Sequence, residues 1–127
     1  MKVERVLETV LYAEDLQEAE AFYTKILGLE VQARLAGRHV FFRCGPGMFL
    51  VFNPKTTEKE KFPHGCHGPS HVAWAIAADT IDSWRQWLQA NEVTITEEVS
   101  WPNGGYSIYF SDPAGNSLEL ATPEVWG

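Results

Sequence analysis

The alternation of apolar and polar positions along this chain predicts the same series of elements twice. An apolar run rich in β-branched residues at 6–13 indicates a strand. From Asp15, a good N-cap with Glu18 three residues later, apolar residues recur at helical spacing up to Gly28. Three more strands are expected before residue 53, with a turn at Gly45-Pro46-Gly47 before the last: 29–35, 39–44 and 48–52.

The second half of the sequence repeats this order. A strand over 71–77 leads to a helix that Asp79 is expected to cap, and three strands follow at 93–99, 106–111 and 117–121. The expected buried positions of that helix are Ile81, Trp84, Trp87 and Leu88. The pattern predicts a single α+β domain over 1–127, in which two βαβββ modules form a curved sheet that encloses a cleft. Module one is expected at about 1–53, a linker at 54–69, and module two at about 70–127.

Composition excludes several functions. The chain has 127 residues and a net charge of −7, with no run of Lys or Arg, so binding of nucleic acid through phosphate neutralisation is not expected. No apolar stretch approaches the roughly 18–20 residues that span a bilayer, and the acidic start lacks a signal-peptide core. Cys44 and Cys66 do not make a disulfide framework. A cytoplasmic protein with no membrane partner is therefore expected.

Polar residues stand at unusual places on the predicted strands. Because side chains alternate along a strand, His71 shares a face with Ala73 and Ala75, and small neighbours leave room for a ligand. Glu119 interrupts the apolar last strand, and Glu8 interrupts the first. A carboxylate on an otherwise apolar strand carries a desolvation cost unless it is paired or bound to a metal.

Several short motifs resemble one superfamily. They are Asp15-Leu16, Phe22-Tyr23, Leu27-Gly28-Leu29, Asp112-Pro113-Ala114-Gly115-Asn116 and Leu118-Glu119-Leu120. Together they resemble the vicinal oxygen chelate superfamily, which includes glyoxalase I, extradiol dioxygenases, methylmalonyl-CoA epimerase, fosfomycin-resistance thiol transferases and bleomycin-resistance proteins. The resemblance covers almost the whole chain.

The resemblance implies three metal ligands: Glu8, where members usually have His, together with His71 and Glu119. Glu8 and Glu119 are also the expected catalytic residues. One imidazole and two carboxylates suit one divalent ion such as Mn²⁺, Fe²⁺, Ni²⁺, Co²⁺ or Zn²⁺. Some members take a further ligand from the fourth strand, but Met48–Phe52 contains none. Since oxygen-activating iron sites normally use two His and one carboxylate, Glu8 argues against dioxygenase chemistry.

The expected substrate-binding residues are Ser107, Tyr109, Trp101 and His64. Ser107 and Tyr109 align with substrate contacts of the fosfomycin-resistance branch, although the chain ends at Gly127 without that branch's later basic residue, so fosfomycin transfer is not expected. Trp101 stacks on a ligand or packs into the core. His64 lies on a loop with Cys66 and His67 that either borders the cleft or, with His71, binds zinc.

Simpler interpretations remain open for each ligand. His71 could be a strand-end histidine, Glu119 could pair with Arg43 or Arg38, and Glu8 could pair with an Arg or Lys. The preferred function is a metal-dependent isomerase, epimerase, lyase or transferase acting on a small oxygenated molecule. The alternative is a metal-free binder of the bleomycin-resistance type. The resemblance also implies a homodimer, in which Glu8 of one subunit joins His71 and Glu119 of the other.

Overall fold

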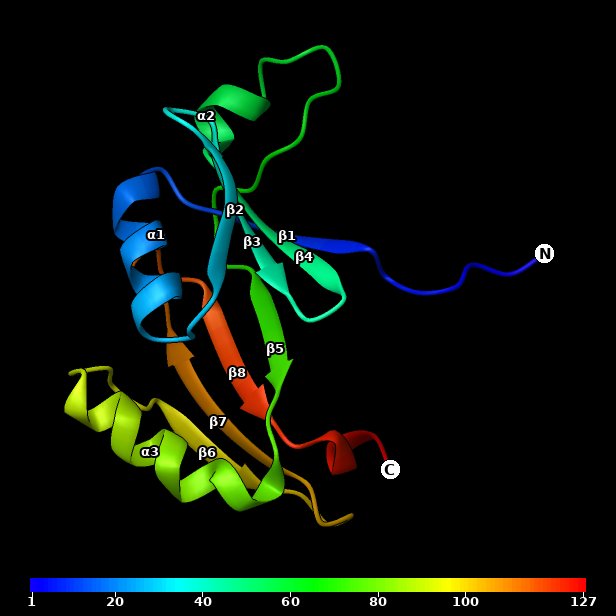
Figure 1. Ribbon diagram of the computed structural model, residues 1–127, viewed down its shortest axis with the longest axis vertical. Coiled ribbons are helices and arrows are strands. Elements are labelled where there is room, and N and C mark those ends of the chain that lie inside the picture. The colour runs from blue at the N-terminus through cyan, green and yellow to red at the C-terminus, as the bar shows by residue number, and fades with distance from the viewer. The chain divides into compact units, whose positions relative to one another are not determined.

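The computed structural model describes all residues from Met1 to Gly127, and the chain divides into two compact units, Met1–Ser70 and His71–Gly127. Each unit contains a four-stranded mixed sheet and a helix of ten residues (Figure 1). The predicted α+β class with two βαβββ repeats is confirmed. No helix combines the length and the apolar character needed to cross a membrane.

The sheet of the first unit has the strand order β1-β4-β3-β2, with β1 parallel to β4 and the other neighbours antiparallel. Its elements are β1 (Glu8–Tyr12), α1 (Leu16–Lys25), β2 (Glu30–Leu35), β3 (His39–Cys44) and β4 (Gly47–Phe52). Helix α1 begins as predicted, because the Asp15 carboxylate accepts a hydrogen bond from the Glu18 amide at 2.9 Å. Gly28 follows the helix with φ of +67°, a conformation that favours glycine.

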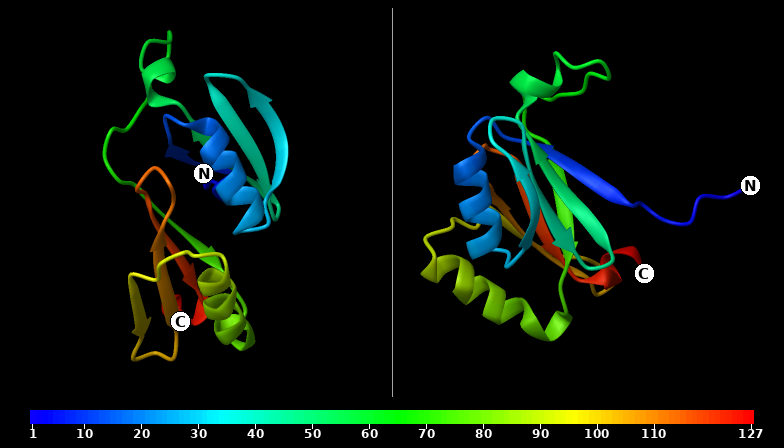
Figure 2. Two further views of the ribbon diagram at one scale, coloured as in Figure 1. Left: turned by 90° about the vertical axis from the view of Figure 1, so that its left-hand side faces the viewer. Right: turned by 45° about the horizontal axis from the view of Figure 1, so that its top comes forward.

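The core of the first unit forms between α1 and one face of the sheet. Tyr23 of α1 is fully buried, and its ring lies 4.8 Å from that of Phe49 and 5.7 Å from that of Phe42, measured between ring centres. Figure 2 shows α1 against this side of the strands. The side chains at alternate positions, which include Glu8 and Tyr12 of β1, therefore belong to the opposite face.

The segment expected to be a linker, 54–69, is attached to the first unit. It contains α2 (Pro54–Thr57), which Asn53 caps through a 3.1 Å bond from the Lys55 amide. The hydroxyl of Thr57 donates to the backbone oxygen of His64 at 2.6 Å, which folds the segment back on itself. Arg38 of the preceding hairpin then binds both carboxylate oxygens of Glu60.

The second unit repeats the topology in the strand order β5-β8-β7-β6, again with the first strand parallel to the last. Its elements are β5 (His71–Ala75), the 3₁₀ turn η1 (Ala78–Thr80), α3 (Ile81–Ala90), β6 (Glu97–Ser100), β7 (Tyr106–Ser111), β8 (Ser117–Ala121) and the 3₁₀ turn η2 (Pro123–Trp126). Fully buried Leu88 of α3 and Leu118 of β8 belong to its core.

Three local expectations for the second unit are wrong. Asp79 does not cap α3, because the chain first makes the turn η1 and the helix starts after Thr80, whose hydroxyl binds the Ala77 carbonyl at 2.6 Å. Of the four α3 positions expected to be buried, only Leu88 is: Ile81 and Trp84 are half-buried, and Trp87 is 45% exposed. Strand β6 starts at Glu97 rather than at Val93.

Candidate metal and substrate site

Two of the three expected metal ligands lie together in the second unit. The Nε2 atom of His71 is 3.2 Å from the Oε2 atom of Glu119. His71 opens β5 opposite Ser117, and Glu119 follows two residues later on β8 opposite Ala73. Because residues two apart point to the same face of a sheet, the parallel register brings the two side chains together on one face.

The orientation of the His71 ring follows from its second nitrogen. Its Nδ1 atom lies 3.0 Å from the backbone oxygen of Ser117. A carbonyl can only accept, so Nδ1 carries a proton, and in the neutral ring Nε2 presents a lone pair. This lone pair faces a carboxylate oxygen, which is also an acceptor. The two atoms are compatible at this distance when a proton or a cation lies between them.

Glu119 is held from its other oxygen. The side chain is 12% exposed, and its Oε1 atom accepts a 2.5 Å hydrogen bond from the hydroxyl of Ser107, which is fully buried on β7. Ser107 in turn accepts a 2.9 Å bond from the indole nitrogen of Trp101, on the loop after β6. The expected substrate contacts Ser107 and Trp101 thus bind the carboxylate and each other.

Tyr109 stands on the same face of the second sheet, opposite Glu119 in the register. Its ring is stacked at 26° to that of His71, with 6.5 Å between the ring centres. Burial and, after it, hydrogen bonding to Glu119 raise the pKa of Tyr109. The phenol therefore stays neutral at physiological pH and donates its hydrogen bond to Glu119.

Glu8, the third expected ligand, belongs to the first unit. It opens β1 as His71 opens β5, and its neighbour in the register is Met48. Its side chain is exposed and has no hydrogen bond or ion pair within the chain, so the desolvation cost expected from the sequence does not arise there. On the same face, β4 carries Met48, Leu50 and Phe52, and none of these offers the imidazole or carboxylate that suits the expected divalent ions.

Neither arginine considered as a partner for Glu119 has that role. Arg38 pairs with Glu60, at 3.0 Å between Nε and Oε2. Arg43 donates to the side-chain oxygen of Gln32 at 3.2 Å. The groups that bind Glu119 within the second unit are His71, Ser107 and Tyr109.

An aromatic cluster on the Glu8 face of the first sheet was not anticipated. The Tyr12 hydroxyl lies 2.7 Å from Nδ1 of His64, and the His64 ring meets the edge of Phe52 at 4.8 Å between centres. Phe41 lies 5.2 Å from Phe52 and is stacked on His39 at 3.9 Å. The alternation that places Glu8 also places Tyr12, Phe52 and Phe41 on this face, so the sequence signal existed. His64 joins them only through the folding of segment 54–69.

The loop histidines and the cysteine near them have separate partners. His67 pairs with Glu58 at 2.5 Å, and the Cys66 thiol donates to the Gly68 carbonyl at 3.2 Å. The hydrogen bond that Ser70 donates to the sulfur lowers the pKa of Cys66, because it stabilises the thiolate. No group of three or more His, Cys, Asp or Glu side chains in the chain is arranged to hold a metal ion, which does not support the zinc interpretation of this loop.

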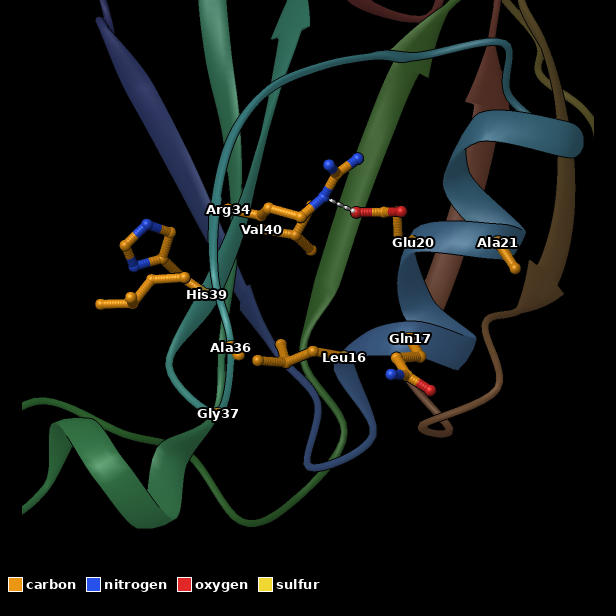
Figure 3. Close-up of a pocket in the computed structure, with 10 residues that line it drawn as sticks. Leu16, Gln17, Glu20, Ala21, Arg34, Ala36, Gly37, His39 and Val40 are labelled. Atoms are coloured by element: carbon orange, nitrogen blue, oxygen red, sulfur yellow. Dashed lines mark hydrogen bonds and ion pairs between the residues drawn. The ribbon is translucent and has the colours of Figure 1, made fainter.

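A surface pocket of about 340 Å³ lies between α1 and the β2–β3 hairpin. Figure 3 shows Arg34 of β2 facing Glu20 of α1, and the ion pair between them measures 2.8 Å. None of the expected ligands, Glu8, His71 and Glu119, lines this pocket. This pocket is therefore not the candidate metal site.

Two βαβββ repeats, with a His–Glu pair on the second sheet, define a glyoxalase-like protein. The family model of the Glyoxalase/Bleomycin resistance protein/Dioxygenase superfamily matches residues 5–120. The chain belongs to this superfamily, as its motifs suggested.

Individual relatives carry different names. "Metallothiol transferase FosB" of Staphylococcus haemolyticus is 32% identical over 104 residues, which cover 80% of this chain and 70% of the relative. "Glutathione transferase FosA" of Serratia marcescens is 29% identical, covering 87% of this chain and 74% of the relative. A crystal structure of "Lactoylglutathione lyase from Agrobacterium tumefaciens" has a TM-score of 0.95 and 38% identity, covering 99% of this chain and 98% of that chain.

Proposed function

We propose that this protein is a divalent-metal-dependent enzyme acting on a small oxygenated substrate, with His71, Glu119 and Glu8 as metal ligands. The observation that carries the proposal is the 3.2 Å distance between Nε2 of His71, the ring nitrogen that has no backbone partner, and Oε2 of Glu119. Two atoms bound side by side on one ion, each about 2.1 Å from it, are about 3 Å apart. The pair is therefore already spaced as neighbouring ligands of one ion.

The donor set fits the metals expected from the sequence. Imidazole nitrogen and carboxylate oxygen suit Mn²⁺, Fe²⁺, Ni²⁺, Co²⁺ and Zn²⁺. The Nδ1 bond of His71 to the Ser117 carbonyl is the kind of contact that orients a metal-binding imidazole. When bound, such an ion acts as a Lewis acid that stabilises negative charge developing on a substrate oxygen.

The third ligand links the proposal to the quaternary structure. Glu8 is exposed and unpaired in the first unit, whereas His71 and Glu119 belong to the second. We propose a homodimer in which Glu8 of one subunit joins the His71–Glu119 pair of the partner subunit. Glu8 opens β1 as His71 opens β5, each on the strand that pairs in parallel with the last strand of its repeat, and this equivalence supports Glu8 as the ligand that the first repeat supplies.

The residues around the pair have defined roles in this proposal. Glu119 is the ionised ligand, which offers Oε2 to the metal and accepts a hydrogen bond from Ser107 through Oε1. Tyr109, whose ring is stacked beside His71 on the same face, offers a substrate an aromatic surface next to the pair. The aromatic cluster around Phe41 and Phe52 offers an apolar surface on the face that carries Glu8.

A metal titration of the purified protein tests the proposal. Apo protein should bind one Mn²⁺, Ni²⁺ or Zn²⁺ per chain in calorimetry, and His71→Ala should abolish this binding. His67→Ala is the matched control, because His67 pairs with Glu58 away from the pair and should leave binding unchanged. Wild-type affinity in His71→Ala would place the metal elsewhere and defeat the proposal.

The substrate class is narrowed by the names of the relatives. Two are named as thiol transferases and one as a lyase of lactoylglutathione. Turnover assays with the metal-loaded protein should therefore include lactoylglutathione and fosfomycin together with a small thiol. Activity with either compound would assign the reaction type.

The second candidate is a metal-free binder of small molecules, of the bleomycin-resistance type. The observation that favours it is that no three ligating side chains gather in the chain by itself. In that case the titration would show no metal uptake, and bleomycin would bind the apo protein with measurable heat.

A further inference from the structure

Each hydrogen bond that links Trp101, Ser107 and Glu119 has a definite direction. An indole nitrogen can only donate, so Ser107 accepts from Trp101 at 2.9 Å. A carboxylate oxygen accepts, so the single hydroxyl proton of Ser107 points to Oε1 of Glu119 at 2.5 Å. The order Trp101 to Ser107 to Glu119 is therefore fixed.

Ser107 has no donor left for a substrate. Its side chain is fully buried, and its only proton is committed to Glu119. Its oxygen has one further lone pair, so it can offer nothing to the anionic oxygens of a phosphonate or carboxylate. This conflicts with the substrate-binding role that the alignment with the fosfomycin-resistance branch implied for Ser107.

The hydrogen bond from Ser107 instead fixes the orientation of the Glu119 carboxylate. With Oε1 held by Ser107, Glu119 presents Oε2 to His71 at 3.2 Å. Hydrogen bonds to charged acceptors are stronger than neutral ones, and a donor that is itself hydrogen-bonded is polarised further. The indole of Trp101 thus strengthens the hold of Ser107 on Glu119 from outside the ligand set.

We propose that Ser107 and Trp101 are positioning residues for the metal site, which set the rotation of the Glu119 carboxylate, and that Ser107 is not a substrate contact. This inference rests on the proposed metal-binding function. Trp101 acts only through Ser107, and 38% of its surface stays exposed.

The test uses Mn²⁺ alone as the probe, on the full-length protein. Ser107→Ala should weaken Mn²⁺ binding about 10-fold or more, the usual effect of losing an outer partner of a ligand. Trp101→Phe, which removes one neutral hydrogen bond, should weaken it about threefold. Ser107→Thr keeps the hydroxyl and should recover most of the affinity lost in Ser107→Ala. Ser111→Ala and Trp126→Phe, at exposed positions of the same unit, should bind as the wild type does.

The double variant Ser107→Ala with Trp101→Phe tests whether Trp101 acts through Ser107, as a relay, or independently of it. Because Trp101 acts through Ser107, Trp101→Phe should cost nothing further in the Ser107→Ala background. Additive losses would overturn the relay, and so would wild-type affinity in Ser107→Ala. If the wild type itself bound no Mn²⁺, the proposed function would fail and the positioning role with it, an outcome distinct from failure of the relay alone.

A nuclear magnetic resonance measurement checks the geometry without metal. Trp101→Phe identifies the Trp101 indole N–H signal among the five tryptophans by its loss. In Ser107→Ala this signal should shift and exchange faster with solvent, because its acceptor is gone. An unchanged signal in a folded Ser107→Ala protein would overturn the proposal.

Discussion

The imidazole of His71 and the carboxylate of Glu119 meet with two acceptor atoms, Nε2 and Oε2, 3.2 Å apart, although the two residues are not direct neighbours in the strand register. The parallel pairing of β5 with β8 places His71 opposite Ser117, whose carbonyl orients the ring toward Glu119. The Ser117 carbonyl sets the tautomer of His71, and Ser107 sets the orientation of the Glu119 carboxylate. The two side chains leave one position for a cation between Nε2 and Oε2.

Glu119→Gln is expected to weaken metal binding more than Glu8→Gln. Loss of an outer partner already costs about 10–100-fold in affinity, so loss of the charge on a buried, oriented ligand should exceed about 100-fold. Glu8 is exposed and unrestrained, and its amide variant should lose less. Calorimetric titration of both variants with Mn²⁺ gives the order, and the reverse order would argue against the ligand roles as assigned.

Mixing two variants that each weaken metal binding, Glu8→Gln and His71→Ala, should test whether the site is shared between subunits. Sedimentation should first give a mass near twice 14.3 kDa. If Glu8 and His71 of one site come from different subunits, unfolding and refolding Glu8→Gln with His71→Ala should restore intact sites in the mixed dimers.

The control for this experiment is the pair His71→Ala and Glu119→Gln. Both residues lie in the second unit, so exchanging subunits cannot rebuild a site from them. Equal metal binding in the two mixtures, or a monomer at micromolar concentration, would contradict the shared arrangement.

Tyr109 should make the stability of the apo protein depend on pH in the alkaline range. Its pKa is raised in the folded protein, chiefly by burial, so the folded state holds the phenolic proton more tightly than the unfolded chain does. The resulting stability is present below the ordinary tyrosine pKa of about 10 and is lost as pH rises through the folded value. Urea unfolding of Tyr109→Phe should therefore show a smaller decline in this range than the wild type, whereas parallel declines would exclude Tyr109 as the cause.

Leu88→Ala should destabilise the second unit. Leu88 is the fully buried residue of α3, and removing such a side chain costs about 2–5 kcal/mol of unfolding free energy. Leu35→Ala is the matched control, since Leu35 is 54% exposed and should cost much less. Urea unfolding followed by circular dichroism measures both, and similar losses would contradict the packing of α3 described above.

The sequence by itself determined the βαβββ repeat and the sheet face on which each strand residue lies. Period-two alternation put His71 and Glu119 on one face of the sheet, opposite the buried Leu118 and Leu120. The Asp15 cap marked the start of α1 correctly, and Gly28 has a positive φ two residues after the C-cap Ile26, because these signals depend on near neighbours in the chain. The cap of α3 was misassigned to Asp79 because the intervening turn η1 depends on how β5 leaves its sheet.

Only the tertiary structure decided how the side chains share their hydrogen bonds. The contact of Trp101 with Ser107 joins a loop to a strand, and that of His64 with Tyr12 joins segments 52 residues apart. No local pattern encodes such pairs, because the conformation of a loop follows from the packing of the strands it connects. The sequence therefore named Ser107 as a residue of the site, and the fold gave its one proton to Glu119 rather than to a ligand.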